Sequence, residues 1–300
     1  ALAESANLPE WLAASGHAQG FLAFRARRFD EARDVLQDAM VRLRRSTGGG
    51  QVLGKLHALL VRTYVELGLP AQAVESFHAA ADQLAPAADP SRQALLHYNM
   101  GIAYEQQRSF DLARSHLERA AELFRLHENL HLLSVAVRSL GMLRLEQGDL
   151  HGARSALEQS LRLSIQVGDD EGRAQTLVEL ARAEVRRGEV ELGRRAAEEA
   201  RALATRLSDH AEAARAEVVL AEAAKAAGRL QDAAERLTAA AETFKHLQMQ
   251  ADFAQVSRDL GFVLMEQGEM AAAAQQFAQA FTHQSPVVTL RGWRGIDGSA

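Results

Sequence analysis

A short pattern recurs seven times along the chain and constrains its fold more than any other feature. Each copy consists of a turn, a small residue shortly after it, and an apolar residue four positions later. The small residues are Ala32, Ala73, Ala113, Ala153, Gly193, Ala233 and Ala273. Their spacing is 41 residues once and then 40 residues five times. A fixed period of this length indicates stacked structural units, because one unit cannot bury its apolar face alone.

Each unit is predicted to contain two helices. Aromatic residues make up only 5% of the chain and Pro occurs 5 times, while Ala, Leu, Glu, Gln and Arg, which favour helix, are abundant. This composition argues against an all-β or an α/β fold. Glycines such as Gly148 and Gly188 follow the first helix of a unit and are expected to end it. N-cap signals for the next unit stand at 89–91, 169–171 and 208–209. The one extra residue is expected in the loop 46–50.

The units resemble the tetratricopeptide repeat. The third unit shows the resemblance best, in Gly101, Tyr104, Ala113, Leu117 and Ala120. The resemblance covers roughly residues 12–284. It implies an all-α fold: a right-handed superhelical α-solenoid of about seven helix pairs.

Two features depart from the family pattern. The period is 40 residues instead of the usual ~34, which resembles the long-repeat subclass found in signal-reading regions of bacterial regulators and in some scaffold proteins. The early Trp of the pattern is replaced by His57 and His97. We divide the chain into an N-terminal lead-in (1–11), a seven-repeat solenoid (12–285) and a non-helical tail after Pro286 (286–300).

Charge and composition exclude several classes of function. The formal net charge is −5, so the chain lacks the strongly basic composition of a nucleic-acid-binding protein. Cysteine is absent, so disulfides and thiol catalysis are excluded. The longest uncharged stretch, 270–290, is too polar to sit in lipid. We expect a cytoplasmic protein without membrane contact, with a signal peptide already removed as the alternative. The missing initiator Met favours a piece of a longer regulator.

One string has the form of a zinc-hydrolase motif, because residues 127–131 spell H-E-x-x-H. In zinc hydrolases the two His lie one turn apart on a helix and the Glu is the general base. A shift by 40 or 80 residues aligns the string with 167–171 and 207–211, which are predicted bends between units. We therefore predict a bend here instead of a zinc site, and keep a metal-dependent hydrolase as an alternative. We expect no enzymatic activity and no cofactor.

In the tetratricopeptide family the first helix of each pair lines a concave groove, and helical spacing identifies that face. It is predicted to mix basic and apolar side chains. The predicted partner-binding residues are Arg62, Tyr98, Asn99, Ile102, Arg138, Met142, Arg182, Arg186, Arg215, Arg258 and Phe262. The same face also holds Lys55, Ala58, Leu95, Val218, Lys225 and Gln255. A neighbouring stripe of small residues, which includes Gly101 and Gly261, is predicted to let helices approach closely.

Such a groove suits an acidic and hydrophobic protein or peptide segment, since Arg pairs with carboxylates and Asn99 can hold a peptide backbone. The alternative is that the arginines pair with Glu66, Glu105, Glu146 and Glu222 inside the groove and bind nothing. The chaperone-tail clamp of the family is incomplete, because Ala58, Val135 and Ser139 stand at positions that need basic residues.

We therefore predict a protein- or peptide-binding module, the sensor part of a bacterial regulator. The alternative is a self-assembling structural scaffold that forms homo-oligomers through the solenoid ends or the C-terminal tail.

Overall fold

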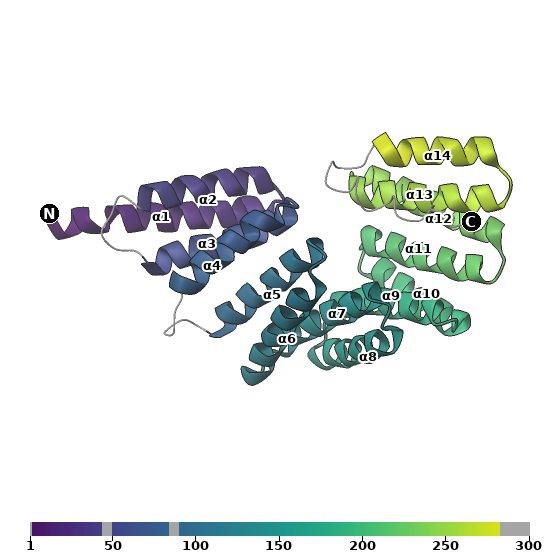
Figure 1. Ribbon diagram of the computed structural model, residues 1–300, viewed down its shortest axis with the longest axis horizontal. Helices are drawn as coiled ribbons and strands as arrows, with labels where there is room; N and C mark the ends of the chain where they lie inside the picture. Colours follow the sequence, from purple (N-terminus) through teal and green to yellow (C-terminus); the bar gives the residue numbers. More distant parts are fainter. Residues whose placement is uncertain (1, 44–49, 84–89, 283–300) are drawn as a thin grey trace, which may run out of the picture. The chain divides into compact units, whose positions relative to one another are not determined.

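The computed structural model describes residues 2–43, 50–83 and 90–282. All elements in these ranges are helices, and none of their residues is in a strand, so the predicted all-α fold is confirmed. The helices are labelled in Figure 1. The chain divides into two compact units, Ala1–Leu143 and Arg144–Ala300, here called the N-terminal and the C-terminal unit. Residues 46–49 of the expected loop, the expected N-cap residue Asp89 and the expected tail 286–300 lie outside the described residues.

The N-terminal unit consists of helix pairs. Its helices are α1 (Leu2–Arg25), α2 (Phe29–Leu43), α3 (Gly50–Glu66), α4 (Pro70–Gln83), α5 (Pro90–Gln106), α6 (Phe110–Leu126) and most of α7 (Leu130–Glu146). Within each pair, α1 packs on α2, α3 on α4 and α5 on α6. The odd-numbered helices α1, α3 and α5 also contact one another in succession, so they form one layer of the unit.

The C-terminal unit repeats this arrangement. Its helices are α8 (Leu150–Val167), α9 (Asp170–Arg186), α10 (Val190–Arg206), α11 (His210–Ala226), α12 (Leu230–His246), α13 (Gln250–Glu266) and α14 (Met270–Thr282). The pairs α9/α10, α11/α12 and α13/α14 are each in contact, and every second helix of a pair packs on the first helix of the next pair. Two helices per 40-residue period are therefore present as predicted.

The N-terminal boundary differs from the expectation. Helix α1 begins at Leu2, so the segment expected to lead into the first helix already belongs to it. Ala, Leu and Glu in this segment are strong helix formers. Pro9 lies two turns inside this helix, where it removes one backbone hydrogen-bond donor.

The turns and caps follow the sequence signals. The second residue after the first helix of each repeat has a positive φ, and it is Gly at five of these positions: Gly68, Gly148, Gly188, Gly228 and Gly268. At the bends between repeats, the Asp169 carboxylate accepts a hydrogen bond from the Gly172 amide at 2.8 Å, and Asp209 accepts one from the Glu212 amide at 2.9 Å. These side chains cap α9 and α11, as predicted.

Small residues let the paired helices approach each other. A Cβ added at Gly101 would lie 2.6 Å from Cγ of Leu117, and one added at Gly261 would lie 2.6 Å from Cε1 of Phe277. The predicted close approach is therefore confirmed at both positions. None of the described helices combines the length and the apolar character that crossing a bilayer requires.

Candidate functional site: two hollows on the odd-numbered helices

The odd-numbered helices of the N-terminal unit form a hollow of about 430 Å³, here called the N-terminal hollow. Its lining comes from α1, α3 and α5 and consists of His17, Phe21, Lys55, Ala58, Leu59, Arg62, Leu95, Leu96 and Asn99. Five of these residues belong to the face predicted from the sequence: Lys55, Ala58, Arg62, Leu95 and Asn99. The predicted face therefore forms a concave surface in this unit.

The N-terminal hollow combines cations with an apolar floor. Lys55 and Arg62 line it, and its lining contains no carboxylate. The Arg62 guanidinium lies 4.7 Å from the ring centroid of Phe24, which supports it by a cation–π contact. Burial lowers the pKa of Arg62, and the nearby charge of Glu66 opposes this effect only in part. Arg62 is therefore a partly desolvated cation that a carboxylate ligand would stabilise.

The other predicted residues of the N-terminal unit lie outside the lining of this hollow. The Tyr98 hydroxyl is 3.2 Å from the Ser139 hydroxyl, so a contact between α5 and α7 uses it. Ile102 and Arg138 are half-buried, and Met142 is exposed. Of the predicted set, the structure thus brings Arg62 and Asn99 together in one hollow.

The sequence prediction missed the contribution of α1. His17 and Phe21 line the N-terminal hollow and precede Ala58 and Arg62 by 41 residues, the same shift that separates Ala32 from Ala73. Extending the predicted face by one period would have found both residues.

A second hollow of about 290 Å³, here called the C-terminal hollow, is lined by the odd-numbered helices α9, α11 and α13 of the C-terminal unit and by Leu237 of α12. Its lining consists of Arg186, Val218, Ala221, Glu222, Lys225, Leu237, Gln255, Asp259, Phe262 and Val263. Arg186 and Phe262 were predicted as partner-binding residues. The Phe262 ring packs edge-on against Phe277 with 5.2 Å between centroids. Half of the Phe262 side chain still faces the hollow or solvent, with 43% of the residue exposed.

Two cations at the C-terminal hollow, Arg182 beside it and Lys225 in its lining, are paired with carboxylates. Arg182 lies 2.8 Å from Glu179 and 3.6 Å from Glu222, and Lys225 lies 2.7 Å from Glu266. The expected alternative, an arginine paired with Glu222 inside the groove, is therefore confirmed for Arg182. Burial opposes the charge of Arg182, but the two carboxylates outweigh it and raise the pKa of this guanidinium.

The remaining predicted arginines of this unit also have polar contacts. Arg215 lies 2.9 Å from Glu212 and 3.5 Å from Asp252. Arg186 donates a hydrogen bond to the Leu145 carbonyl at 3.5 Å. Arg258 donates to the side-chain oxygen of its neighbour Gln255.

Burial also acts on the carboxyl groups of the C-terminal hollow. It raises the pKa of Glu222 and Asp259, although nearby Arg182 and Arg258 respectively favour their charged forms. The surface of this hollow is therefore rich in charge, but its charges compensate one another.

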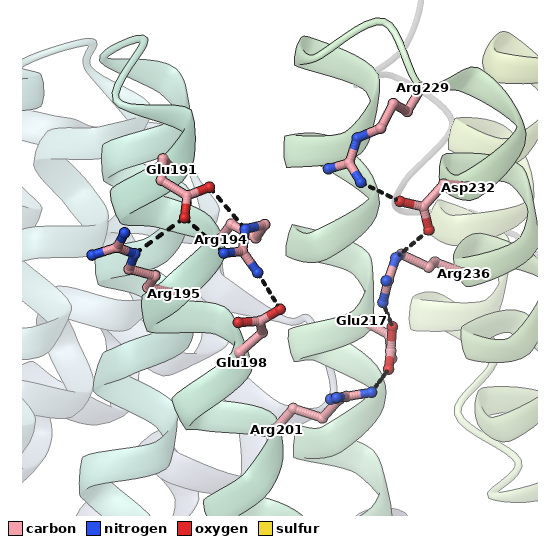
Figure 2. Close-up of polar contacts among 9 residues, drawn as sticks. All are labelled: Glu191, Arg194, Arg195, Glu198, Arg201, Glu217, Arg229, Asp232 and Arg236. Carbon is pink, nitrogen blue, oxygen red and sulfur yellow. Dashed lines mark hydrogen bonds and ion pairs between the residues drawn. The ribbon is translucent and has the colours of Figure 1, made fainter.

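Arginine–carboxylate pairs also cover the even-numbered helices α10 and α12 (Figure 2). Arg194 lies between Glu191 and Glu198, at 2.6 and 2.5 Å. Glu217 of α11 joins Arg201 of α10 at 2.9 Å to Arg236 of α12 at 2.8 Å. Exposed pairs of this kind contribute little stability, and this face is a solvated one.

The H-E-x-x-H string lies in a bend, as predicted. Helix α6 ends at Leu126 and α7 begins at Leu130, and Glu128 between them has a φ of 52°. The two His therefore do not lie one turn apart on a common helix, which the zinc motif requires. Among the residues that the structure describes, no group of three or more His, Cys, Asp or Glu could hold a metal ion.

Comparison with known proteins supports the repeat assignment. Sequence profiles described as tetratricopeptide repeat match residues 92–166 and 218–287. A search of curated proteins found no match to the chain.

Similar solved structures are helical-repeat proteins of low sequence identity. A Rap protein complexed with competence and sporulation factor has a TM-score of 0.71 and 15% identity, over 91% of this chain and 76% of its own. The apo form of the quorum sensor NprR from B. thuringiensis has a TM-score of 0.72 and 14% identity, over 92% and 77%.

A third similar structure is a signal-transduction ATPase with a tetratricopeptide repeat sensor from Pyrococcus horikoshii. Its TM-score is 0.69 at 12% identity, over 90% of this chain and 42% of the ATPase. Sequence identities this low show a shared fold and nothing more. The two profile matches and the 40-residue helix pairs show that the chain belongs to the tetratricopeptide repeat family.

Proposed function

We propose that this protein is the sensor module of a regulator and binds a protein or peptide segment on its odd-numbered helices. The N-terminal hollow carries the proposal, because two cations border an apolar floor there and no carboxylate lines it. The segment that fits this surface places an Asp or Glu beside an apolar side chain. In this proposal the module is cytoplasmic, has no enzymatic activity and makes no direct contact with nucleic acid.

The proposed recognition rests on the environment of Arg62. A guanidinium that is partly removed from water loses hydration, and a ligand carboxylate can replace it with two parallel hydrogen bonds. Lys55 supplies a second positive charge on the same helix, two turns away. The Asn99 amide can donate to and accept from the ligand backbone, while Leu95 and Phe21 cover its apolar side chain.

The regulatory part of the proposal is supported by the similar structures. One is a Rap protein in complex with a signalling factor, one is a quorum sensor, and one contains a repeat region described as a sensor. Transferred to this chain, these descriptions suggest that ligand binding on the odd-numbered helices is read out by a neighbouring effector.

The test uses matched fluorescent peptides that alternate Leu with Glu or, in the control set, Leu with Gln. Fluorescence anisotropy measures their affinity for the full chain and for the double variant Lys55→Gln, Arg62→Gln. We expect the acidic peptides to bind at least tenfold more tightly than the amide peptides, a preference of ~1.4 kcal/mol. The double variant should lose this preference. Arg42→Gln is the matched control, because Arg42 is an exposed arginine on α2 that is paired with Asp38.

A second variant adds a carboxylate without removing a cation. Ile102 stands 40 residues after Arg62, as Glu222 stands 40 residues after Arg182 and pairs with it. Ile102→Glu should therefore satisfy Arg62 internally and weaken the acidic peptide. Equal binding of acidic and amide peptides by the native chain, or native affinity in the double variant, would contradict the proposal.

A further inference from the structure

Beyond the proposed function, the first and last described helices each expose an apolar face. In α1, Leu22 is 66% exposed and Leu12 is 44% exposed, and no charged residue occurs between Trp11 and Phe24. In α14, Met270 is 60% exposed and Phe281 is 71% exposed, and residues 270–282 contain no charge. Large exposed apolar side chains on an uncharged surface indicate an interaction site.

The repeat register shows which kind of helix packs against the face that α14 exposes. Forty residues earlier, the positions of Met270, Ala274 and Phe281 are occupied by Leu230, Ala234 and Ala241 of α12. There Ala234 and Ala241 are buried and Leu230 is partly buried, in one cluster with α13 residues such as Phe253 and Val256. The face that α14 exposes is therefore the face with which α12 receives α13.

The exposed face of α1 is the other half of the same contact. The equivalent residues of α13 follow those of α1 by 241 positions, which is one step of 41 and five of 40. Leu12 thus corresponds to Phe253, Ser15 to Val256 and Leu22 to Val263. In α13 all three are buried, and they belong to the cluster shared with α12. In α1 the corresponding three residues are exposed.

We propose that α14 of one copy packs against α1 of a second copy in the way that α12 packs against α13 within the chain. The occupant follows from the register, because one chain carries both complementary halves of an interface that it also builds internally. The contact joins different surfaces of the two copies, so it is heterologous and extends head to tail. A contact between two single helices is smaller than a standard protein interface of ~1,600 Å², so the association is weak and depends on concentration.

The test is sedimentation equilibrium of the full chain from low micromolar to several hundred micromolar concentration. We expect the weight-average mass to rise with concentration in the native chain. Leu22→Glu places a charge on the α1 face and Phe281→Glu places one on the α14 face. Each variant alone should stay monomeric. An equimolar mixture should form a one-to-one complex, because each variant retains the face that the other has lost.

Two control variants add the same charge beside the proposed faces. Ala14→Glu lies on α1 at the position of exposed Gln255, and Gln275→Glu lies on α14 at the position of exposed Glu235. Both should associate like the native chain. Circular dichroism checks that all variants are equally helical.

Other occupants give different results, and each would overturn the proposal. A dimer in which α1 meets α1 would persist in Phe281→Glu, and one in which α14 meets α14 would persist in Leu22→Glu. If residues 283–300 of the same chain cover α14, the full chain would stay monomeric and only a chain truncated after Thr282 would associate. A mass that stays monomeric in the native and in the truncated chain would exclude end-to-end association altogether.

Discussion

Arg62 and Arg182 occupy the same position of the repeat, three periods apart, yet their environments are opposite. Burial lowers the pKa of Arg62, which lines a hollow without carboxylates. The pKa of Arg182 is raised despite burial, because Glu179 and Glu222 lie beside it. The repeat position therefore determines the helix face on which an arginine lies, but it does not determine which groups surround its guanidinium.

The difference comes from two other positions of the repeat. One helical turn before the arginine, the N-terminal unit has Leu59 and the C-terminal unit has Glu179. One period after it, Ile102 in the N-terminal unit corresponds to Glu222 in the C-terminal unit. With apolar residues at both positions no carboxylate from them neutralises the arginine, whereas with carboxylates its charge is neutralised within the fold.

The largest effect on stability is expected from removing Arg182, and only a small effect is expected from removing Arg62. Arg182→Ala leaves Glu179 and Glu222 without their main partner in a mostly buried setting, and it should destabilise the C-terminal unit by about 2–3 kcal/mol. Arg62→Met retains the apolar stem and removes a poorly solvated charge. It should change the stability of the N-terminal unit by less than about 1 kcal/mol, because the loss of the cation–π contact with Phe24 and of the charge interaction with Glu66 is offset by removing the cost of burying the charge.

Urea unfolding followed by hydrogen exchange of peptides from α3–α5 and α9–α11 measures the two units separately. Arg195→Ala serves as the control, because this exposed arginine is paired with Glu191 on the outer face. Equal losses from Arg62→Met and Arg182→Ala would show that the two environments do not differ in energy.

The sequence predicted the parts of this comparison that depend on the period. Seven small residues at a 40-residue spacing predicted paired helices, their turns and the face that holds Arg62 and Arg182. The same period predicted that the H-E-x-x-H string is a bend, because its equivalents in later repeats are bends.

The rest depends on three-dimensional detail that a pattern does not specify. Whether Arg182 reaches Glu222 one repeat away depends on the distance between α9 and α11 and on side-chain rotamers. Tyr98 stands on the predicted face, but its hydroxyl contacts Ser139, which follows it by 41 residues. A residue on the groove face can therefore contact the next repeat as readily as a ligand.

An effect of intermediate size is expected from acid, and it has opposite signs in the two units. In the N-terminal unit, His97 and His116 approach with their Nδ1 atoms 3.1 Å apart. Burial, together with the neighbouring His97 and His78, lowers the pKa of His116 from 6.5 to about 4, and burial and Arg119 lower that of His97. The folded state thus favours neutral rings. The contribution of these rings to stability should be fully present above their pKa in the unfolded state, and it should decline as the pH falls from 6.5 towards 4.

In the C-terminal unit three buried acids have pKa values shifted upwards. Burial raises the pKa of Glu212, Glu222 and Asp259 above their usual values, so the folded state favours their protonated forms. Their contribution to stability should therefore increase as the pH falls through these raised values.

Hydrogen exchange at pH 7 and pH 5, corrected for the intrinsic rates, measures both trends. We expect the N-terminal unit to lose about 1 kcal/mol, a value reduced for the solvent screening of half-exposed rings. His116→Gln keeps a hydrogen-bonding partner for His97 and removes one titrating group, so it should flatten this loss. If the stability of both units changes in the same direction when the pH falls, the prediction that their buried groups have opposite effects is wrong.

The smallest effect is expected at the turns, where the two units also differ. The left-handed residue between paired helices is Gly at every such turn of the C-terminal unit, but it is Arg27 and Arg108 at two turns of the N-terminal unit, with φ of 58° and 60°. A non-glycine residue in this conformation carries a strain of about 1 kcal/mol. Arg27→Gly should relieve it and stabilise the N-terminal unit by roughly 0.5–1 kcal/mol.

Arg108 lies 5.0 Å from the Phe110 ring centroid, and Arg108→Gly also loses that cation–π contact, which is worth about as much. We therefore expect thermal unfolding to show a gain for Arg27→Gly and no net change for Arg108→Gly. An equal gain in both would mean that the Arg108–Phe110 contact contributes nothing to stability.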